Sequence, residues 1–287
     1  MIKKSLLFLV VLLLIYSVYI AQKPINYGVS QHQWQDNVIK AQNLIFSKDT
    51  VSSIIVGSSL STRLSSDSIT YTYNLSFGGL SLFDGLSLIK HHHIKPKYIF
   101  IETNLLMRKA DQTFLKGLNN QFLYYLRKEN ISLRENKQPL AILSSHISII
   151  LGNILPQKNT TIKAEDKKVA LNKLLEIHKK NYAIAVEDQA INNQIAELKK
   201  IITELEKNDI QFIFFEMPTH KIIESSYLAK KVRINILNAF SNYPFIPILP
   251  NLKLRTTDGL HLRPDDARLY SSLLNKEFKK HVYSRNN

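Results

Sequence analysis

The stretch VSSIIVGSSL, residues 51–60, decides the fold of this chain. Its first part, Val51–Val56, is a short run rich in apolar β-branched residues, and Gly57 ends it. Such a run predicts a buried β-strand. Ser58 and Ser59 therefore follow directly on the end of a strand, in a tight turn.

Working outward from this strand, similar apolar runs recur along the chain. They predict further strands at residues 70–75, 98–101, 210–215 and 245–249. Apolar residues at helical spacing predict helices at residues 36–46, 80–90, 167–207, 226–240 and 264–280. Strands that alternate with helices indicate an α/β fold, here a doubly wound parallel sheet of about five strands with helices on both faces.

The polar motifs of the chain follow these predicted strands. Gly57-Ser58-Ser59-Leu60 comes after the first, Asn74-Leu75-Ser76-Phe77-Gly78-Gly79 after the second, and Glu102-Thr103-Asn104 after the third. Asp258-Gly259-Leu260-His261 lies in a loop near the C-terminus. Because the carboxyl ends of parallel strands meet at one edge of a sheet, we expect these motifs to converge there.

The residue types in these motifs suit acyl transfer. Ser59 is the candidate nucleophile, His261 the base that takes its proton, and Asp258 the acid that orients His261. A tetrahedral oxyanion also needs hydrogen-bond donors. The backbone N–H groups of Ser59 and Gly79 and the side-chain amide of Asn104 are the candidates.

Each piece alone also has a structural interpretation. Ser59 lies in a serine-rich turn, Asp258-Gly259 is a turn signal, and Asn104 and His261 suit helix caps. His220 is an alternative base, but no acid stands beside it in sequence. The three histidines at residues 91–93 favour an exposed loop over a metal site, because adjacent histidines cannot all face one metal in regular structure. Only the four motifs taken together predict an active site.

These motifs resemble the blocks of the SGNH hydrolase superfamily, also called the GDSL-type esterase/lipase family. Its first block, Gly-Asp-Ser-Leu, resembles residues 57–60, and its second-block glycine resembles Gly79. Its third block, Gly-x-Asn, resembles residues 102–104, and its fifth, Asp-x-x-His, resembles residues 258–261. The resemblance spans about residues 51–280, with 105–168 unmatched. It implies a flavodoxin-like sandwich with Ser59, Asp258 and His261 as catalytic residues, and Ser59, Gly79 and Asn104 in the oxyanion hole.

Two positions depart from the family pattern. Ser58 stands where the first block has Asp, and Glu102 stands where the third block has Gly. A carboxylate at residue 102 would crowd or repel an oxyanion, point away from it, or bind a polar substrate. Catalytic activity therefore depends on where Glu102 points.

The N-terminus carries an apolar segment, residues 5–20, which follows Lys3 and Lys4. It is slightly short for a membrane span, and long for the apolar core of a signal peptide. Cleavage after Ala21 would place Tyr19 at the −3 position, which favours an uncleaved anchor. We expect a single-pass protein of a bacterial inner membrane, with both lysines cytoplasmic and the catalytic domain periplasmic.

The expected domains are the membrane anchor at 1–22, a stalk and first helix at 23–50, and an SGNH-like domain at 51–287. A helical insertion at about 105–168 would cap the site. The net charge of +15 is scattered along the chain, and indicates a solvated surface or attraction to anionic lipid or acidic polysaccharide. No motif or aromatic-interleaved basic stripe indicates a nucleic-acid partner.

The chain has no cysteine, which excludes disulfides and thiol chemistry. Its sequence lacks a phosphate loop, a dinucleotide-binding glycine motif and a His-Glu-x-x-His motif, so no cofactor or metal is expected.

The expected function is a serine-dependent ester hydrolase or O-acyltransferase. Its expected substrates are acylated glycans or small acyl esters, with acetyl esters of a cell-envelope polysaccharide foremost. The anchored arrangement resembles an envelope subgroup that takes part in polysaccharide O-acylation and D-alanyl transfer, which implies a multi-pass membrane O-acyltransferase as partner. Two alternatives stay open: an impaired SGNH-like domain that binds glycan or scaffolds such an enzyme, and a lipid esterase.

Overall fold

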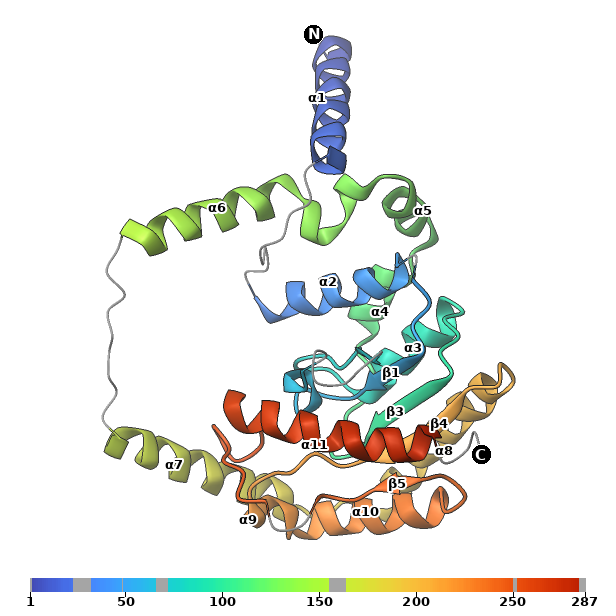
Figure 1. Ribbon diagram of the computed structural model, residues 1–287, viewed down its shortest axis with the longest axis vertical. Coiled ribbons are helices and arrows are strands. Elements are labelled where there is room, and N and C mark those ends of the chain that lie inside the picture. Colours follow the sequence, from blue (N-terminus) through green and yellow to red (C-terminus); the bar gives the residue numbers. More distant parts are fainter. Residues whose placement is uncertain are drawn as a thin grey trace. The chain divides into compact units, whose positions relative to one another are not determined.

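The computed structural model describes residues 2–22, 32–47, 49–65, 72–154, 164–249 and 252–283 (Figure 1). The chain divides into two compact units. The anchor unit comprises Met1–Lys48 and Lys116–Thr160, and the sheet unit comprises Asp49–Leu115 and Thr161–Asn287. Each unit is therefore built from two separate segments of the sequence.

The sheet unit contains one five-stranded sheet in the order β2-β1-β3-β4-β5. Every neighbouring pair is parallel. The strands are β1 (Ser53–Val56), β2 (Thr72–Asn74), β3 (Tyr98–Glu102), β4 (Gln211–Phe215) and β5 (Phe245–Ile246). The predicted α/β class and the five parallel strands are confirmed. From β1 the chain first adds β2 on one side of the sheet and then adds β3, β4 and β5 on the other side. In open parallel sheets, sites form at such a switch point, which lies here between β1 and β3.

One face of the sheet packs against the C-terminal helix α11 (Pro264–Tyr283). Ile55 lies beside Phe100, and Phe100 beside Ile213, so these three side chains point to the same face. Phe278 of α11 stacks on Phe100, with ring centroids 3.6 Å apart. Truncating Phe100 to Ala would cost about 3–5 kcal/mol, because the rings of both residues are buried there.

The opposite face receives other helices of the sheet unit. Val56 points to that face, and Gly85 of α3 (Leu82–His91) lies so close that an added Cβ would be 3.0 Å from Val56 Cγ1. Phe240, which caps α10 (Tyr227–Ala239), packs on Phe214 with ring centroids 4.7 Å apart. Because residue 85 has no side chain, α3 packs closely against Val56 at the end of β1.

The predicted helix at residues 167–207 is wrong in one respect. Two helices occupy this stretch, α7 (Ala164–Ala183) and α8 (Asp188–Glu206). Glu187 caps α8 and Asp188 lies in its first turn, so a second helix start is hidden inside the apolar pattern. The short helix α9 (Lys221–Glu224) precedes α10, and the predicted start of the last helix at Pro264 is confirmed.

The anchor unit is helical. It contains α1 (Ile2–Gln22), α2 (Gln33–Ile45), α5 (Gln121–Glu129), the 3-10 turns η3 (Ile131–Leu133) and η4 (Glu135–Lys137), and α6 (Pro139–Ile154). Helix α4 (Gln112–Asn119) crosses the boundary between the two units. Gln42 accepts a hydrogen bond from the backbone N–H of Glu135 at 2.8 Å, and this bond joins α2 to the insertion.

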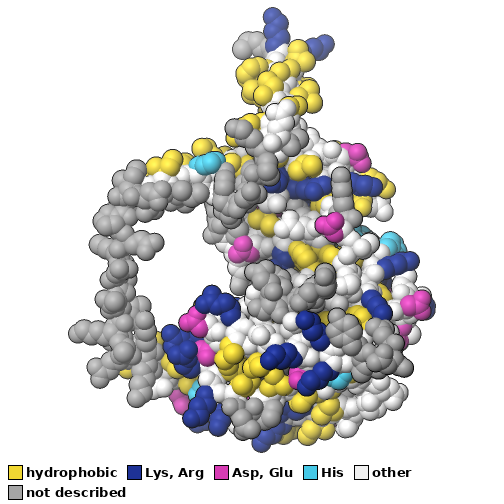
Figure 2. Space-filling model, viewed as in Figure 1, with side chains coloured by type: hydrophobic (Ala, Val, Ile, Leu, Met, Phe, Trp, Pro, Cys, Tyr) yellow, Lys and Arg dark blue, Asp and Glu magenta, His cyan; other side chains and the backbone are white. Residues whose placement is uncertain are grey.

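Helix α1 is long and apolar enough to span a membrane over Ile2–Ile20, and a signal sequence would have the same character. Figure 2 shows hydrophobic side chains around this helix and Lys or Arg side chains at its free end. The expected stalk at residues 23–31 lies outside the described residues. The expected role of the insertion at about residues 105–168 as a cap over the site stays a prediction.

Candidate active site

Ser59, His261 and Asp258 form a continuous hydrogen-bonded chain. Ser59 Oγ lies 2.9 Å from His261 Nε2, and His261 Nδ1 lies 2.6 Å from Asp258 Oδ2. The side chains of His261 and Asp258 are 23% and 27% exposed, so the group is partly open to solvent. The structure thus brings together three residues that the sequence separates by up to 202 positions, in the order that proton transfer from a serine requires.

The loop that carries Asp258 and His261 is held by its own backbone. Asp258 Oδ1 accepts the N–H groups of Leu260 at 3.0 Å and His261 at 2.8 Å, and Gly259 adopts a φ of +96°. A bridge between Thr256 and Leu262 closes the base of the loop. Burial would raise the pKa of Asp258, but the hydrogen bonds and charge of His261 outweigh it and hold that pKa below its ordinary value. Asp258 is therefore an ionised partner for the imidazole.

The turn that carries Ser59 is held by Asn74 and Arg63, to which the sequence motifs assign no role. Asn74 Nδ2 donates to the carbonyl oxygens of Ser61 at 2.8 Å and Leu64 at 3.1 Å, on either end of the 3-10 turn η1 (Ser61–Arg63). Arg63 Nη1 donates to the carbonyl of Leu262 at 2.5 Å. Arg63 thereby links the serine turn to the histidine loop, a contact that no local sequence pattern indicates.

Glu102 points into the turn at the end of β1. Its Oε2 accepts Ser58 N–H at 2.7 Å, Ser58 Oγ at 2.6 Å and Ser61 Oγ at 3.2 Å, and its Oε1 accepts Asn104 N–H at 3.0 Å. The residue is 1% exposed. Burial raises the pKa of Glu102, and these hydrogen bonds oppose the shift. The carboxylate is thus occupied with positioning the backbone beside Ser59.

The three candidate oxyanion donors differ in their availability. Within the described part of the chain, neither Ser59 N–H nor Gly79 N–H donates to a protein acceptor. Gly79 has a φ of +75°, a conformation that favours glycine, and it is exposed. Phe77 N–H bonds Gly57 O at 3.4 Å, so the loop of Gly79 lies beside the serine turn.

Asn104 is engaged more fully than the sequence suggests. Its Nδ2 donates to Met217 O at 2.8 Å and its Oδ1 accepts Met217 N–H at 2.7 Å, so the amide pairs with the backbone after β4. An amide carries two N–H donors, and one of them is used here. Asn104 can therefore offer its second N–H to an oxyanion while Met217 holds the side chain in a fixed orientation.

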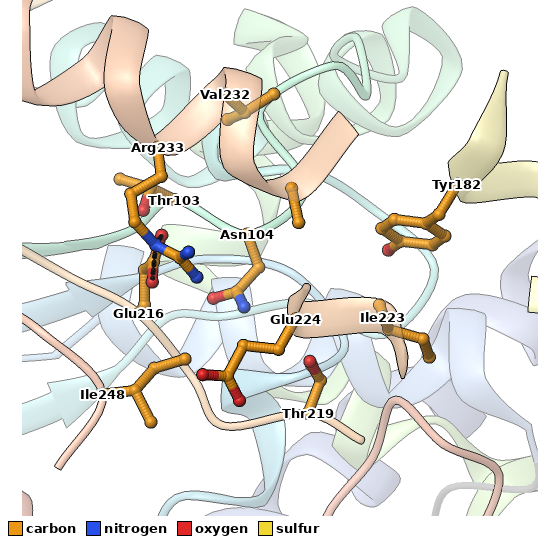
Figure 3. Close-up of a pocket in the computed structure, with 11 residues that line it drawn as sticks. Thr103, Asn104, Tyr182, Glu216, Thr219, Ile223, Glu224, Val232, Arg233 and Ile248 are labelled. Atoms are coloured by element: carbon orange, nitrogen blue, oxygen red, sulfur yellow. Dashed lines mark hydrogen bonds and ion pairs between the residues drawn. The ribbon is translucent and has the colours of Figure 1, made fainter. Parts of the chain in front are cut away.

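A small hollow with about 20 Å³ of accessible space lies next to Asn104 (Figure 3). Most of its lining is polar, from Thr103, Asn104, Tyr182, Glu216, Thr219, Glu224 and Arg233. Arg233 Nε donates to both carboxylate oxygens of Glu216, at 3.0 and 2.8 Å. Burial raises the pKa of Glu216, and Arg233 opposes it. Burial raises the pKa of Tyr182 to about 12, so its hydroxyl stays protonated. The hollow offers both donors and acceptors to a polar ligand.

The remaining histidine candidates lie in structural positions. His220 caps α9 by accepting Ile222 N–H at 3.3 Å through Nδ1. His91 ends α3, and the exposed His93 follows with a φ of 52°. Among the described residues, no group of three or more His, Asp or Glu side chains could hold a metal ion.

Comparisons with protein-family models, with curated proteins and with solved structures found no match to this chain. The resemblance to the SGNH superfamily therefore stays a prediction that rests on the quoted motifs.

Proposed function

We propose that this chain is a serine-dependent ester hydrolase or O-acyltransferase with a doubly wound fold of the SGNH type. The observation that carries the proposal is the chain of hydrogen bonds from Ser59 through His261 to Asp258. Serine becomes nucleophilic only when a base takes its proton, and histidine needs a carboxylate to fix its tautomer and stabilise the imidazolium. The three residues, joined by these two contacts, would fill these roles.

The reaction would proceed in two halves. Ser59 Oγ attacks the acyl carbonyl while its proton passes to His261 Nε2, and Asp258 stabilises the resulting imidazolium. His261 then gives the proton to the leaving alcohol. The acyl group stays bonded to Ser59 Oγ as an ester. In the second half, His261 deprotonates the acceptor that attacks this ester, and it returns the proton to Ser59 Oγ as the bond between the acyl group and Ser59 breaks. Water as acceptor gives hydrolysis, and a sugar hydroxyl gives acyl transfer.

As the substrate we propose an acylated envelope glycan, whose hydroxyl groups would bond the polar side chains that gather beside Asn104. Glu224 and Thr219 face the hollow near Asn104 (Figure 3). Glu224→Gln would remove the charge of one hydrogen-bond acceptor. It is expected to raise KM for an acetylated oligosaccharide severalfold, with little change in kcat for a small aryl acetate. Equal effects on the two substrates would contradict this assignment.

For its location, the proposal is a single-pass protein of a bacterial inner membrane with the sheet unit in the periplasm. The apolar helix α1 and the lysines that precede its apolar run support it. A multi-pass membrane O-acyltransferase is the proposed partner, which would supply the acyl group.

A second candidate function is a non-catalytic glycan-binding or scaffolding domain. The pairing of both ends of the Asn104 amide with Met217 favours it, because a side chain held in this way contributes to stability whether or not catalysis occurs. The two functions differ in whether Ser59 reacts.

The test uses the full chain in detergent micelles, treated with a fluorophosphonate probe and assayed for release of acetate from an aryl ester. Ser59→Ala and His261→Ala should abolish both labelling and turnover. The matched controls are Ser87→Ala on α3 and His220→Asn, which keeps a side-chain cap on α9. Both controls should behave like the parent chain.

Labelling that persists in Ser59→Ala would overturn the role of Ser59, because another nucleophile would then react. A folded parent chain that takes no label would favour the scaffold. Turnover that rises steeply with acyl chain length would instead favour a lipid esterase.

A further inference from the structure

The apolar length of α1 is the starting point. Its membrane-spanning candidate, Ile2–Ile20, has 19 residues. At about 1.5 Å per residue this stretch is about 28 Å long, close to the roughly 30 Å of a bilayer's hydrocarbon core. A helix with so little spare length must use nearly all of it to cross the membrane.

The last part of this stretch is covered by the insertion. Tyr16 donates to the carbonyl of Lys137 at 2.5 Å, and Ser17 Oγ lies 2.9 Å from Ser132 Oγ. Ile20 packs in a cluster with Ala141 and Ile142 at the start of α6. Residues 2–15, which precede the first of these contacts, span about 21 Å of helix. The bilayer must therefore reach the part of the anchor unit that surrounds residues 16–20.

Helix α6 starts at this depth and presents an apolar face to solvent. Leu140, Leu143, Ile147, Ile150 and Leu151 are 78%, 55%, 48%, 55% and 47% exposed. At about 100° per residue these five side chains cover about 100° of arc on one side of the helix. Ala141, Ile142 and Ser145 are buried on the other side. Figure 2 shows the hydrophobic side chains along α6.

We propose that α6 lies in the headgroup region of the same bilayer that α1 spans, with Leu140, Leu143, Ile147, Ile150 and Leu151 inserted among the lipids. The inference rests on the proposed membrane span of α1. A lipid surface is the occupant that the structure favours, because the cluster of Ile20, Ala141 and Ile142 fixes the start of α6 at the point where α1 leaves the hydrocarbon. An interfacial amphipathic helix buries such an apolar face about 5–10 Å into the boundary of headgroups and acyl chains.

The absence of cysteine from the chain makes a direct test simple. Single cysteines are introduced in the full chain, labelled with a nitroxide and reconstituted into vesicles of phosphatidylethanolamine and phosphatidylglycerol. Leu143→Cys and Ile147→Cys report the proposed lipid-facing side. The matched control on the same helix is His146→Cys, which is also exposed but lies about 90° around the axis. Leu9→Cys on α1 and the exposed Asn192→Cys on α8 mark lipid and water.

The readout is the accessibility of each nitroxide to oxygen, which concentrates in lipid, relative to a water-soluble nickel complex. Residues 143 and 147 should give ratios severalfold above those of residues 146 and 192, and approach that of residue 9. Ratios equal to that of residue 192, with residue 9 in lipid, would overturn the placement of α6 while the anchor stands.

A water-like value at residue 9 would overturn the membrane span itself, and the placement of α6 with it. Low accessibility to both reagents at residues 143 and 147, with spin–spin broadening that vanishes on dilution with unlabelled chain, would show that a second copy covers this face instead of lipid.

Discussion

The side chains of Ser58 and Glu102 are joined by a hydrogen bond of 2.6 Å. These are the two positions at which the chain departs from the SGNH motifs quoted above, and the structure places them in contact. Ser58 lacks the carboxylate of the first-block motif, and Glu102 brings a carboxylate to the same turn from the end of β3. Gly57 belongs to the same arrangement, because an added Cβ there would lie 2.7 Å from Glu102 Cβ.

This contact predicts that the two departures compensate for one another. Glu102→Gly alone would leave the buried N–H of Ser58 without its acceptor, and Ser58→Asp alone would place two carboxylates together. Each should cost about 1–3 kcal/mol of stability. The double variant Ser58→Asp/Glu102→Gly should recover most of that loss, because one carboxylate is restored to the turn.

The measurement is a double-mutant cycle on the unfolding free energy, repeated on kcat. A coupling of at least about 1 kcal/mol is expected for residues in direct contact. Additive losses would show that the two substitutions are independent.

Asp258→Asn tests the role of the carboxylate in the proposed mechanism. The amide cannot stabilise the imidazolium and favours the wrong tautomer, so kcat should fall about 10³- to 10⁴-fold with the fold retained. The rate of fluorophosphonate labelling depends on the same activation of Ser59 by His261, so it should fall together with kcat. A loss of less than tenfold would mean that His261 does not depend on Asp258.

The depressed pKa of Asp258 also predicts how stability varies with pH. Because folding lowers this pKa, the group contributes stability above its ordinary pKa, and that contribution is lost as pH falls through the folded value. Thermal midpoints of the parent chain should therefore fall more steeply below about pH 4 than those of Asp258→Asn. Parallel curves for the two proteins would contradict this expectation.

Two glycines should respond to alanine in opposite directions. Gly259 has a φ of +96°, and an added Cβ would lie 2.5 Å from Leu175 Cδ2 on α7. Gly259→Ala should therefore cost more than about 1 kcal/mol and lower kcat, because the loop that carries Asp258 and His261 must shift. Gly117 in α4 has nothing within 4 Å of its added Cβ, so Gly117→Ala should stabilise the chain by about 0.5–1 kcal/mol.

Thermal unfolding and the aryl-acetate assay measure both effects. If Gly259→Ala matches the parent chain in kcat, the conformation of this loop does not set the position of His261.

Asn104→Ala separates catalysis from stability. It removes a proposed oxyanion donor, and for that role about a 100- to 1000-fold loss of kcat is expected. It also removes the two hydrogen bonds to Met217. The matched control is Ser271→Ala on α11, which removes the buried hydroxyl that accepts Ser65 N–H. This variant should lose stability without losing kcat. If both variants lose kcat to the same extent, Asn104 acts through stability alone.

Much of the fold follows from local patterns. The β-branched run that ends at Gly57 predicted β1, and the observed strand is Ser53–Val56. Pro264 predicted the start of α11. Both signals concern short-range sterics and burial, which a few consecutive residues determine. The break between α7 and α8 was missed because apolar spacing continues across it, and only Glu187 and Asp188 mark the new helix start.

The site was predictable in its residue types and only partly in its contacts. Ser59, His261 and Asp258 were expected to meet, and they do. That Glu102 would bond Ser58, or that Asn104 would pair with Met217, could not be read from the sequence. These bonds join residues 44 and 113 positions apart, and their geometry depends on how neighbouring strand ends pack.

The spacing of these partners also governs when they can form during synthesis. Ser59 is made early, and His261 follows 202 residues later. A nascent chain that has completed β5 therefore holds every strand of the sheet and still has no His261. Likewise, Glu135, whose backbone N–H donates to the Gln42 side chain of α2, is made 93 residues after Gln42. In the proposed mechanism, a chain that ends between β5 and His261 would therefore hold the whole sheet and still lack the base that activates Ser59.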